Sequence, residues 1–235
     1  ILQQELNSLV DRQGYEEAID VRNRFFQFRR LITQQLFNTH EFSAYNNSEA
    51  ALKDLSHILQ NYLPHLSDLK RVECYDISNL SQREATGSMV VLVDGQADKS
   101  QYRKFKVKNP TTFSDFGMIE EVIRRRFKNS WPEPNLIVVD GGKPQVRTVI
   151  RTLSEVQKDI PTIGIAKGPD RLIIGVSNLP SIRPNLQRPG FNLVRFIRDE
   201  SHRFAHKYHL YLRSSSLRAQ REVRSKERDS SRSLH

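Results

Sequence analysis

The chain has 235 residues, enough for one sizeable domain and an appendage. Apolar residues make up 37 % of it, and no run of 18 apolar residues occurs, so no membrane-spanning helix is expected. Cys74 is the only cysteine, which excludes an internal disulfide and a cysteine-based zinc site. The net charge is +10, which favours a polyanionic partner, either nucleic acid or an anionic membrane surface.

The two ends of the chain bear on its context. No signal peptide is visible at the start, and with a single cysteine this favours a cytoplasmic protein. The first residue is Ile1 rather than methionine, which indicates a piece of a longer chain. The basic tail at 214–235 has no apolar period and is expected to be disordered.

The first part of the chain is predicted to be helical. Residues 1–37 have apolar positions at helical spacing on either side of Gly14, which predicts a small helical hairpin. Such a short pair buries little surface alone, so it needs a partner or a docking site on the chain. Residues 38–70 are interpreted as a helical connector, with a helix at 50–62 that Asn46-Asn47-Ser48 can cap.

From residue 71 the pattern changes to strands. Three segments rich in valine, isoleucine and aromatic residues, at 72–78, 85–93 and 101–108, predict strands, and Asp94-Gly95 predicts a hairpin between the second and third. A helix is expected at 116–127, capped by Ser114 or Asp115.

The second half of this region alternates strands and helices. The apolar runs 136–140 and 162–166 predict buried strands, with a helix at 146–156 between them and a helix from 191 to 212 after a proline-rich loop. Strands with short connections are antiparallel, whereas a strand–helix–strand unit is parallel. The α/β fold expected for 71–213 is therefore a mixed sheet of three antiparallel strands followed by a parallel βαβ unit, the layout of ribonuclease H-like nucleases.

Two aspartates stand out in the predicted strands. Asp76 interrupts an apolar strand, where an ionised carboxylate is costly without a partner, although a strand end facing water explains it equally well. Asp140 closes a buried strand, at the end where parallel α/β sheets bind ligands. The Asp-Gly sequence that follows is also an ordinary turn. Two carboxylates on neighbouring strands suggest a site for Mg²⁺ or Mn²⁺, which can activate water for phosphodiester hydrolysis.

The loop after Asp140 allows another interpretation. Gly141 and Gly142 let the backbone approach a phosphate closely, with Lys143 as a cation, which would suit a nucleotide-binding regulator. The Walker pattern is missing, so this is the least favoured interpretation.

Histidines line one flank of the last predicted helix. Arg198, His202, His206 and His209 follow one another beside its apolar stripe. Any one histidine is more often structural than catalytic, and the spacing does not choose among the three.

Basic residues cluster on the predicted strands and helices. In residues 102–108 basic side chains alternate with others along the predicted strand, which can place cations on one face for phosphate contact. The residues predicted to contact DNA are Arg103, Lys104, Lys106, Arg126, Lys143 and Lys167.

Five segments resemble, in order, the endonuclease domain of the UvrC family of excinucleases. They are Glu73-Cys-Tyr-Asp76-Ile-Ser, Ser100-Gln-Tyr-Arg-Lys-Phe, Val122-Ile-Arg-Arg-Arg, Val139-Asp140-Gly-Gly-Lys143 and Ile197-Arg-Asp-Glu-Ser-His202-Arg-Phe-Ala. Residues 1–32 resemble the family's UvrB-binding motif through Tyr15-Glu-Glu-Ala18-Ile-Asp-Val-Arg22-Asn23.

The resemblance implies a ribonuclease H-like fold and an endonuclease of nucleotide excision repair. The enzyme would cut damaged double-stranded DNA on the 5′ side of a lesion after recruitment by UvrB. Its catalytic residues would be Asp76, Asp140 and His202, with Asp115 as a further acidic position. The two aspartates Asp76 and Asp140 would bind Mg²⁺ or Mn²⁺. Residues implied in UvrB binding are Tyr15, Glu16, Ala18, Arg22 and Phe25.

Two function classes follow. One is a divalent-metal-dependent DNA endonuclease, without a membrane or small-molecule partner. The other is a catalytically silent module that retains the fold and binds UvrB or DNA. The three catalytic candidates favour the first, and a nuclease assay with Mg²⁺ or Mn²⁺ separates the two.

Overall fold

A computed structural model describes residues 44–66, 68–79, 85–107, 114–166 and 170–206. The chain divides into two compact units, residues 1–47 and residues 48–235. The predicted hairpin at 1–37 and the tail at 214–235 lie outside the described residues. In the described part of the chain, no helix is both long enough and apolar enough to cross a membrane.

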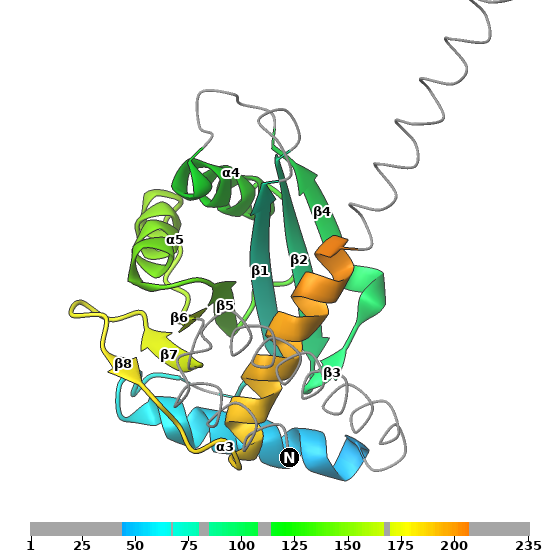
Figure 1. Ribbon diagram of the computed structural model, residues 1–235, viewed down its shortest axis with the longest axis vertical. Coiled ribbons are helices and arrows are strands. Elements are labelled where there is room, and N and C mark those ends of the chain that lie inside the picture. Colours follow the sequence, from blue (N-terminus) through cyan, green and yellow to red (C-terminus); the bar gives the residue numbers. More distant parts are fainter. Residues whose placement is uncertain (1–43, 67, 80–84, 108–113, 167–169, 207–235) are drawn as a thin grey trace, which may run out of the picture. The chain divides into compact units, whose positions relative to one another are not determined.

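The second unit is built on a mixed sheet whose strands follow the order β3-β2-β1-β5-β6-β7-β8, with β4 also paired to β2 (Figure 1). The strands are β1 (Arg71–Asn79), β2 (Ala85–Val93), β3 (Gln96–Ala97), β4 (Arg103–Lys106), β5 (Leu136–Asp140), β6 (Thr162–Ala166), β7 (Arg171–Ile174) and β8 (Ser181–Ile182). β2 runs antiparallel to β1, β3 and β4, whereas β5 is parallel to both β1 and β6. The expected antiparallel half and parallel half are therefore confirmed.

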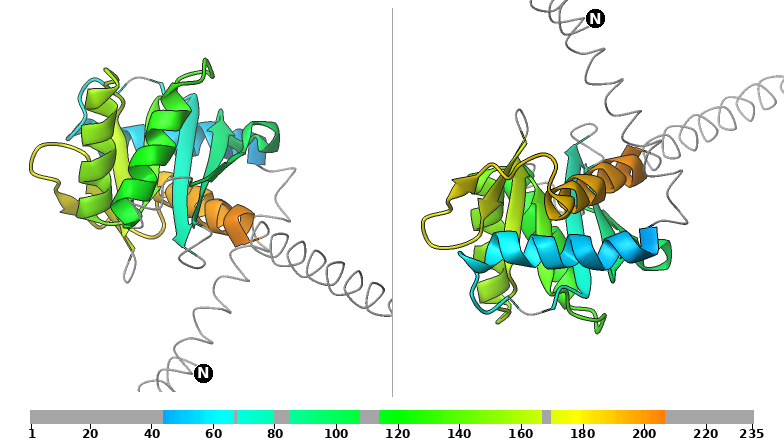
Figure 2. Two further views of the ribbon diagram at one scale, coloured as in Figure 1. Left: turned by 90° about the horizontal axis from the view of Figure 1, so that it is seen from above. Right: turned by 90° about the horizontal axis from the view of Figure 1, so that it is seen from below.

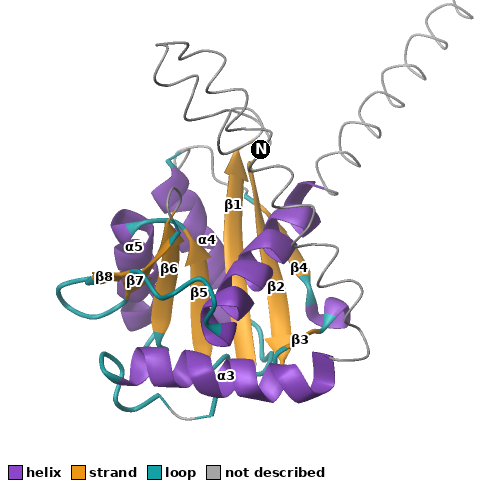
Figure 3. Cartoon of the chain, turned by 60° about the horizontal axis from the view of Figure 1, so that its bottom comes forward, coloured by secondary structure: helices purple, strands orange, loops and turns teal. Residues whose placement is uncertain are grey.

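Helices cover both faces of this sheet (Figures 2 and 3). α4 (Asp115–Phe127) and α5 (Lys143–Glu155) lie on one face. α3 (Ala44–Gln60) and a helix at residues 189–206 lie on the other. Strand side chains alternate between the faces, so neighbouring residues enter different cores. Cys74 packs with the core under the 189–206 helix, and Tyr75 with the core under α4.

The antiparallel half follows from local turn chemistry. Asp94 and Gly95 both have positive φ, of 50° and 76°, which is the conformation of a two-residue hairpin turn between β2 and β3. The expected third strand at 101–108 is shorter, because a 3₁₀ turn, η1 (Lys99–Gln101), precedes β4. Neither β7 nor β8 was expected from the sequence, because one is four residues long and the other lies in the proline-rich loop.

The 189–206 helix is fixed at its start by α3. Asp54 of α3 accepts a hydrogen bond from the Gly190 amide at 2.8 Å and pairs with Arg188 at 2.6 Å. A Cβ atom at Gly190 would lie 2.3 Å from the Leu55 backbone nitrogen, so glycine allows the two helices to touch. Residues 48–60 thus belong to the core of the second unit. The helix expected at 50–62 is present, but the cap expected at Asn46-Asn47-Ser48 is wrong, since α3 begins at Ala44 and ends at Gln60.

Candidate active site

The two aspartates lie side by side where the parallel pairing of β1 and β5 ends: Asp140 is the last residue of β5, whereas β1 continues beyond Asp76 to Asn79. The last recorded pair between β1 and β5 is Tyr75 with Val139, and Asp76 and Asp140 each follow directly. Because side chains alternate along a strand, both carboxylates leave the sheet on the face opposite Tyr75 and Val139. Asp76 is 4 % exposed, so it is not a strand end facing water. The expectation that these aspartates occupy adjacent strands on one face is confirmed.

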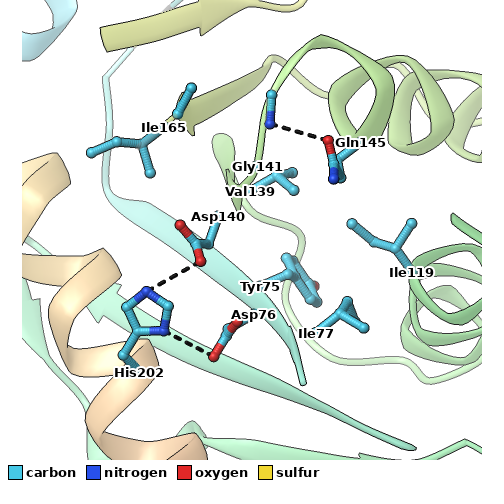
Figure 4. Close-up of a pocket in the computed structure, with 12 residues that line it drawn as sticks. Tyr75, Asp76, Ile77, Ile119, Val139, Asp140, Gly141, Gln145, Ile165 and His202 are labelled. Atoms are coloured by element: carbon cyan, nitrogen blue, oxygen red, sulfur yellow. Dashed lines mark hydrogen bonds and ion pairs between the residues drawn. The ribbon is translucent and has the colours of Figure 1, made fainter. Parts of the chain in front are cut away.

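His202 enters the site from the 189–206 helix and lies between the two carboxylates (Figure 4). Its Nδ1 is 3.2 Å from Oδ2 of Asp76, and its Nε2 is 3.1 Å from Oδ2 of Asp140. One ligand atom from each of the three residues lies within 4.8 Å of the others. The fold thus brings together three residues that are far apart in the sequence, since Asp76 and His202 are separated by 126 positions.

A pocket opens over this centre, and its lining has two kinds of surface. The polar side consists of Asp76, Asp140 and His202. Apolar side chains complete the lining: Ile77 and Ile119 lie on the side away from His202, whereas Ile165, the partner of Asp140 on β6, lies near Asp140 (Figure 4). Sequence reasoning missed these apolar residues, because each resembles an ordinary core position in its strand or helix. The side chains of Asp76 and Asp140 are each 6 % exposed, and such burial strengthens electrostatic interactions there.

The loop after β5 forms one edge of the pocket. Gly141, Gly142 and Gln145 line it, and the Gln145 side chain accepts a hydrogen bond from the Gly142 amide at 3.1 Å. That amide, one of those expected to cradle a phosphate, is therefore engaged within the chain. Lys143 is exposed in the first turn of α5.

The carboxylates set the charge of the histidine. The pKa of His202 is raised to about 9, chiefly by its hydrogen bonds to Asp140 and Asp76, against the opposing effect of burial. Both ring nitrogens then carry protons and each donates to one carboxylate. Beneath them, burial and the two negative charges raise the pKa of the Cys74 thiol, so this thiol stays protonated.

A pH-dependent contribution to stability follows for the metal-free protein. A histidine whose pKa rises on folding stabilises the folded state fully below its unfolded pKa of about 6.5, and loses this effect as pH rises through about 9. We expect His202→Gln to lower the free energy of unfolding by about 2 kcal/mol at pH 6 and by much less at pH 10. Urea unfolding in the presence of a chelator measures this difference. The exposed His206 provides the control, since His206→Gln should change stability little at either pH. An equal cost of His202→Gln at both values would contradict the charged pairing.

The donor set suits a hard divalent cation. Carboxylate oxygens are the ligands that Mg²⁺ and Mn²⁺ prefer, and an imidazole nitrogen beside them is compatible with Mn²⁺. The imidazolium of His202 balances one of the two negative charges in the metal-free protein and leaves a net negative charge that would attract a cation.

The basic residues of β4 that were predicted to contact DNA point to different faces of the sheet. Lys104 and Lys106 are exposed on β4, and Lys104 Nζ lies 4.7 Å from the Phe204 ring centre, which places it on the face that carries His202. Arg103 points to the other face, where it stacks on Trp131 and donates to the carbonyls of Ser100 and Tyr102.

Arg126 was predicted to contact DNA, and this prediction is wrong. Its side chain is fully buried under the sheet, where it pairs with Glu73 at 2.9 Å and donates to the Pro132 carbonyl at 2.6 Å. The physical reason is helical spacing, because Arg126 continues the buried stripe of Ile119 and Ile123 on α4.

Several predicted residues lie outside the described part of the chain. Lys167 and His209 belong to segments that are not described, and Asp115 is described only as the first residue of α4. The residues implied in UvrB binding, which all precede position 44, are Tyr15, Glu16, Ala18, Arg22 and Phe25.

The mixed sheet, with a carboxylate and histidine pocket at its parallel strand ends, defines a ribonuclease H-like nuclease domain. Residues 60–206 match the family model of the UvrC RNase H endonuclease domain, so the chain belongs to that family.

Two relatives with similar sequences carry the same name. The chain is 42 % identical over 168 residues to UvrABC system protein C of Chlorobium chlorochromatii, a match that covers 70 % of this chain and 25 % of that protein. It is 35 % identical over 227 residues to UvrABC system protein C of a Cyanothece species, covering 89 % of this chain and 34 % of that protein. The chain thus spans about a quarter to a third of the length of these relatives.

Two solved structures of endonuclease V align with parts of the chain. Endonuclease V from Bacillus subtilis aligns with a TM-score of 0.38 and 12 % identity, over 65 % of this chain and 92 % of that one. The catalytic domain of human endonuclease V aligns with a TM-score of 0.34 and 21 % identity, over 54 % and 58 % of the two chains.

Proposed function

We propose that this chain is a divalent-metal-dependent DNA endonuclease whose catalytic residues are Asp76, Asp140 and His202. The observation that carries the proposal is their convergence in one pocket, from two adjacent strands and a helix on the same face of the sheet. Buried carboxylates are costly unless they are neutralised, so an arrangement that collects two of them beside a histidine is typical of a catalytic or metal site.

Asp76 and Asp140 would hold Mg²⁺ or Mn²⁺ through their carboxylate oxygens. A bound divalent ion lowers the pKa of a water molecule and stabilises negative charge on phosphate oxygens. His202 would hold or transfer a proton at its ring nitrogens beside the scissile phosphate. The apolar wall that includes Ile77 and Ile119 would keep bulk water away from these groups. Asp115 remains a proposed further acidic residue at the start of α4.

The DNA backbone would be held by exposed cations near the pocket. Lys104 and Lys106 on β4, and Lys143 at the start of α5, are exposed and carry no role in the hydrophobic core. Lys167 completes the proposed set, and Arg103, which stacks on Trp131 at the opposite face of the sheet, is left out of it. With a net charge of +10, DNA affinity should fall as the salt concentration rises.

The wider role we propose is in nucleotide excision repair, with a cut on the 5′ side of a lesion after recruitment by UvrB. The family match and the relatives named UvrABC system protein C support this role. Recruitment would use residues 1–32, where the Tyr15 to Asn23 segment resembles a UvrB-binding motif.

The test is single-turnover cleavage of duplex DNA carrying a lesion, with UvrB present and with Mn²⁺ or Mg²⁺ added. We expect metal-dependent nicking that a chelator abolishes. His202→Ala should lower the rate by a factor on the order of 10² or more, the lower range for a lost acid–base group, with little change in DNA affinity. The matched control is His206→Ala, because His206 lies one helical turn away and is exposed.

The outcomes separate the two function classes. Binding of DNA without nicking in either metal ion would favour the catalytically silent module. Nicking that survives His202→Ala at the wild-type rate would remove the histidine from the mechanism and leave the two aspartates.

A further inference from the structure

The turn of the 189–206 helix that carries His202 is held by side chains on both flanks. On one flank Glu200 accepts a hydrogen bond from the hydroxyl of Tyr102, which directly precedes β4, at 2.9 Å. On the other flank Arg198 donates to Asp170, which directly precedes β7, at 2.7 Å. The two partners thus reach the helix from strands that lie on either side of β1 and β5 in the sheet.

Helical geometry explains why these contacts oppose each other. Successive residues of an α-helix are rotated by about 100°, so Ser201, which is fully buried, marks the middle of the packed face. Arg198 and His202 then lie together on one flank of this face, four residues apart. Glu200 and Phe204 lie together on the other flank, also four residues apart.

A small rotation of the helix would displace the histidine. A ring atom about 8 Å from the helix axis moves by roughly 1.4 Å when the helix turns by about 10°. That distance separates a good hydrogen bond from a poor one at both carboxylates. The packed face of the helix sets its rotation approximately, and directional contacts with fixed partners restrict the rotation further.

We propose that Tyr102 and Asp170 are positioning residues that fix the rotation of this helix and so hold His202 over Asp76 and Asp140. The proposal rests on the proposed function, because it concerns the same site. It assigns a role to the Ser100 to Phe105 segment that contact with DNA alone does not explain. It also gives Glu200 and Arg198 roles beside that of the histidine that follows them in sequence.

Tyr102 is held in place by burial, by ring packing and by its hydrogen bond to Glu200. Its side chain is 8 % exposed, and its ring meets Phe204 edge to face at 5.1 Å. Burial, followed by the neighbouring Glu200 carboxylate, raises the pKa of Tyr102, so its hydroxyl remains a donor. Glu200 also accepts two hydrogen bonds from Arg203 at 2.6 Å each, which keeps its carboxylate in place.

Asp170 forms the corresponding contacts on the other flank of the helix. Besides Arg198 it binds Arg195, one turn earlier on the same helix, at 3.1 Å. Arg198 is further held by Asp199 at 2.9 Å. The carboxylate of Asp170 therefore binds side chains from two consecutive turns of the helix, on the flank where His202 lies.

The test uses Tyr102→Phe, which removes only the hydroxyl and keeps the packing against Phe204. Tyr62→Phe is the matched control, because Tyr62 packs against the same core at its edge. We expect Tyr102→Phe to lower the single-turnover cleavage rate at saturating Mn²⁺ about tenfold, a loss typical of a slightly misplaced catalytic group. Affinities for DNA and Mn²⁺ should change little. Asp170→Asn should act in the same direction.

A double-mutant cycle separates positioning from a general structural effect. If Tyr102 acts through His202, adding Tyr102→Phe to His202→Ala should lower the rate no further. A full additional loss in the His202→Ala background would overturn the proposal, and so would an unchanged rate in Tyr102→Phe alone.

A second measurement does not depend on cleavage. The ring nitrogen NMR signals of His202 in the metal-free protein should shift in Tyr102→Phe and stay in place in Tyr62→Phe. If the wild-type chain does not cut DNA, the proposed function fails, and these signals alone decide the positioning role. Unchanged signals in Tyr102→Phe would refute it.

Discussion

Replacing either Asp76 or Asp140 by asparagine is expected to abolish metal-dependent cleavage. The rate should fall by at least about a thousandfold, more than the roughly 10- to 100-fold loss typical when a residue that only supports a metal ligand is changed. The physical reason is that asparagine keeps the shape of aspartate but not its charge. A divalent ion would then face one carboxylate in place of two, and affinity falls with the number of charged ligands.

Metal binding gives this prediction a readout of its own. An ion that binds only the folded protein raises its melting temperature, so Mn²⁺ should stabilise the wild-type chain and should not stabilise Asp76→Asn or Asp140→Asn. In the metal-free state each variant should remain folded, because it loses one hydrogen bond to His202 but also a neighbouring like charge.

The control for charge is Glu49→Gln, since the Glu49 side chain is 75 % exposed on α3. It should cut DNA and respond to Mn²⁺ as the wild-type chain does. Wild-type cleavage by Asp140→Asn would exclude the proposed metal site.

Arg126→Ala is expected to destabilise the domain by about 3–5 kcal/mol, the cost of breaking a buried ion pair by removing one partner. The variant leaves Glu73, which is fully buried, with fewer donors. Glu73 is held by Arg126 at 2.9 Å, by Arg71 at 2.8 Å and by the Tyr75 hydroxyl at 2.6 Å. Burial and the Glu73 carboxylate raise the pKa of Tyr75, so the tyrosine stays neutral and contributes a hydrogen bond to Glu73 but no charge.

Urea unfolding of Arg126→Ala beside Arg125→Ala measures this cost. Arg125 is the adjacent arginine of the same run, but its side chain is 35 % exposed and pairs with Glu121 on the surface, so its loss should cost about 1 kcal/mol or less. Equal stability of Arg126→Ala and Arg125→Ala would contradict the buried pair. Each variant loses one positive charge, so the two should bind DNA with similar affinity.

The sequence by itself determined the strands that carry the site. The runs at 136–140 and 162–166 are apolar throughout, as strands buried on both faces require, and they coincide with β5 and β6. The order of strands and helices fixed the parallel pairing of β5 and β6, since a connection through a helix returns the chain in the same direction. Asp140 at the end of such a strand was therefore already marked as a site residue.

Tertiary structure alone decided which charged residues meet. Helical spacing made His202, His206 and His209 equal candidates, and only the placement of the helix over β1 and β5 brings His202 between the two aspartates. Arg126 belongs to a run of three arginines that suggests a basic surface. Its burial depends on a single carboxylate, Glu73, which lies 53 residues earlier on a neighbouring strand. Local periodicity reports which face of an element is apolar, whereas the partner of a polar group is set by contacts between segments far apart in the chain.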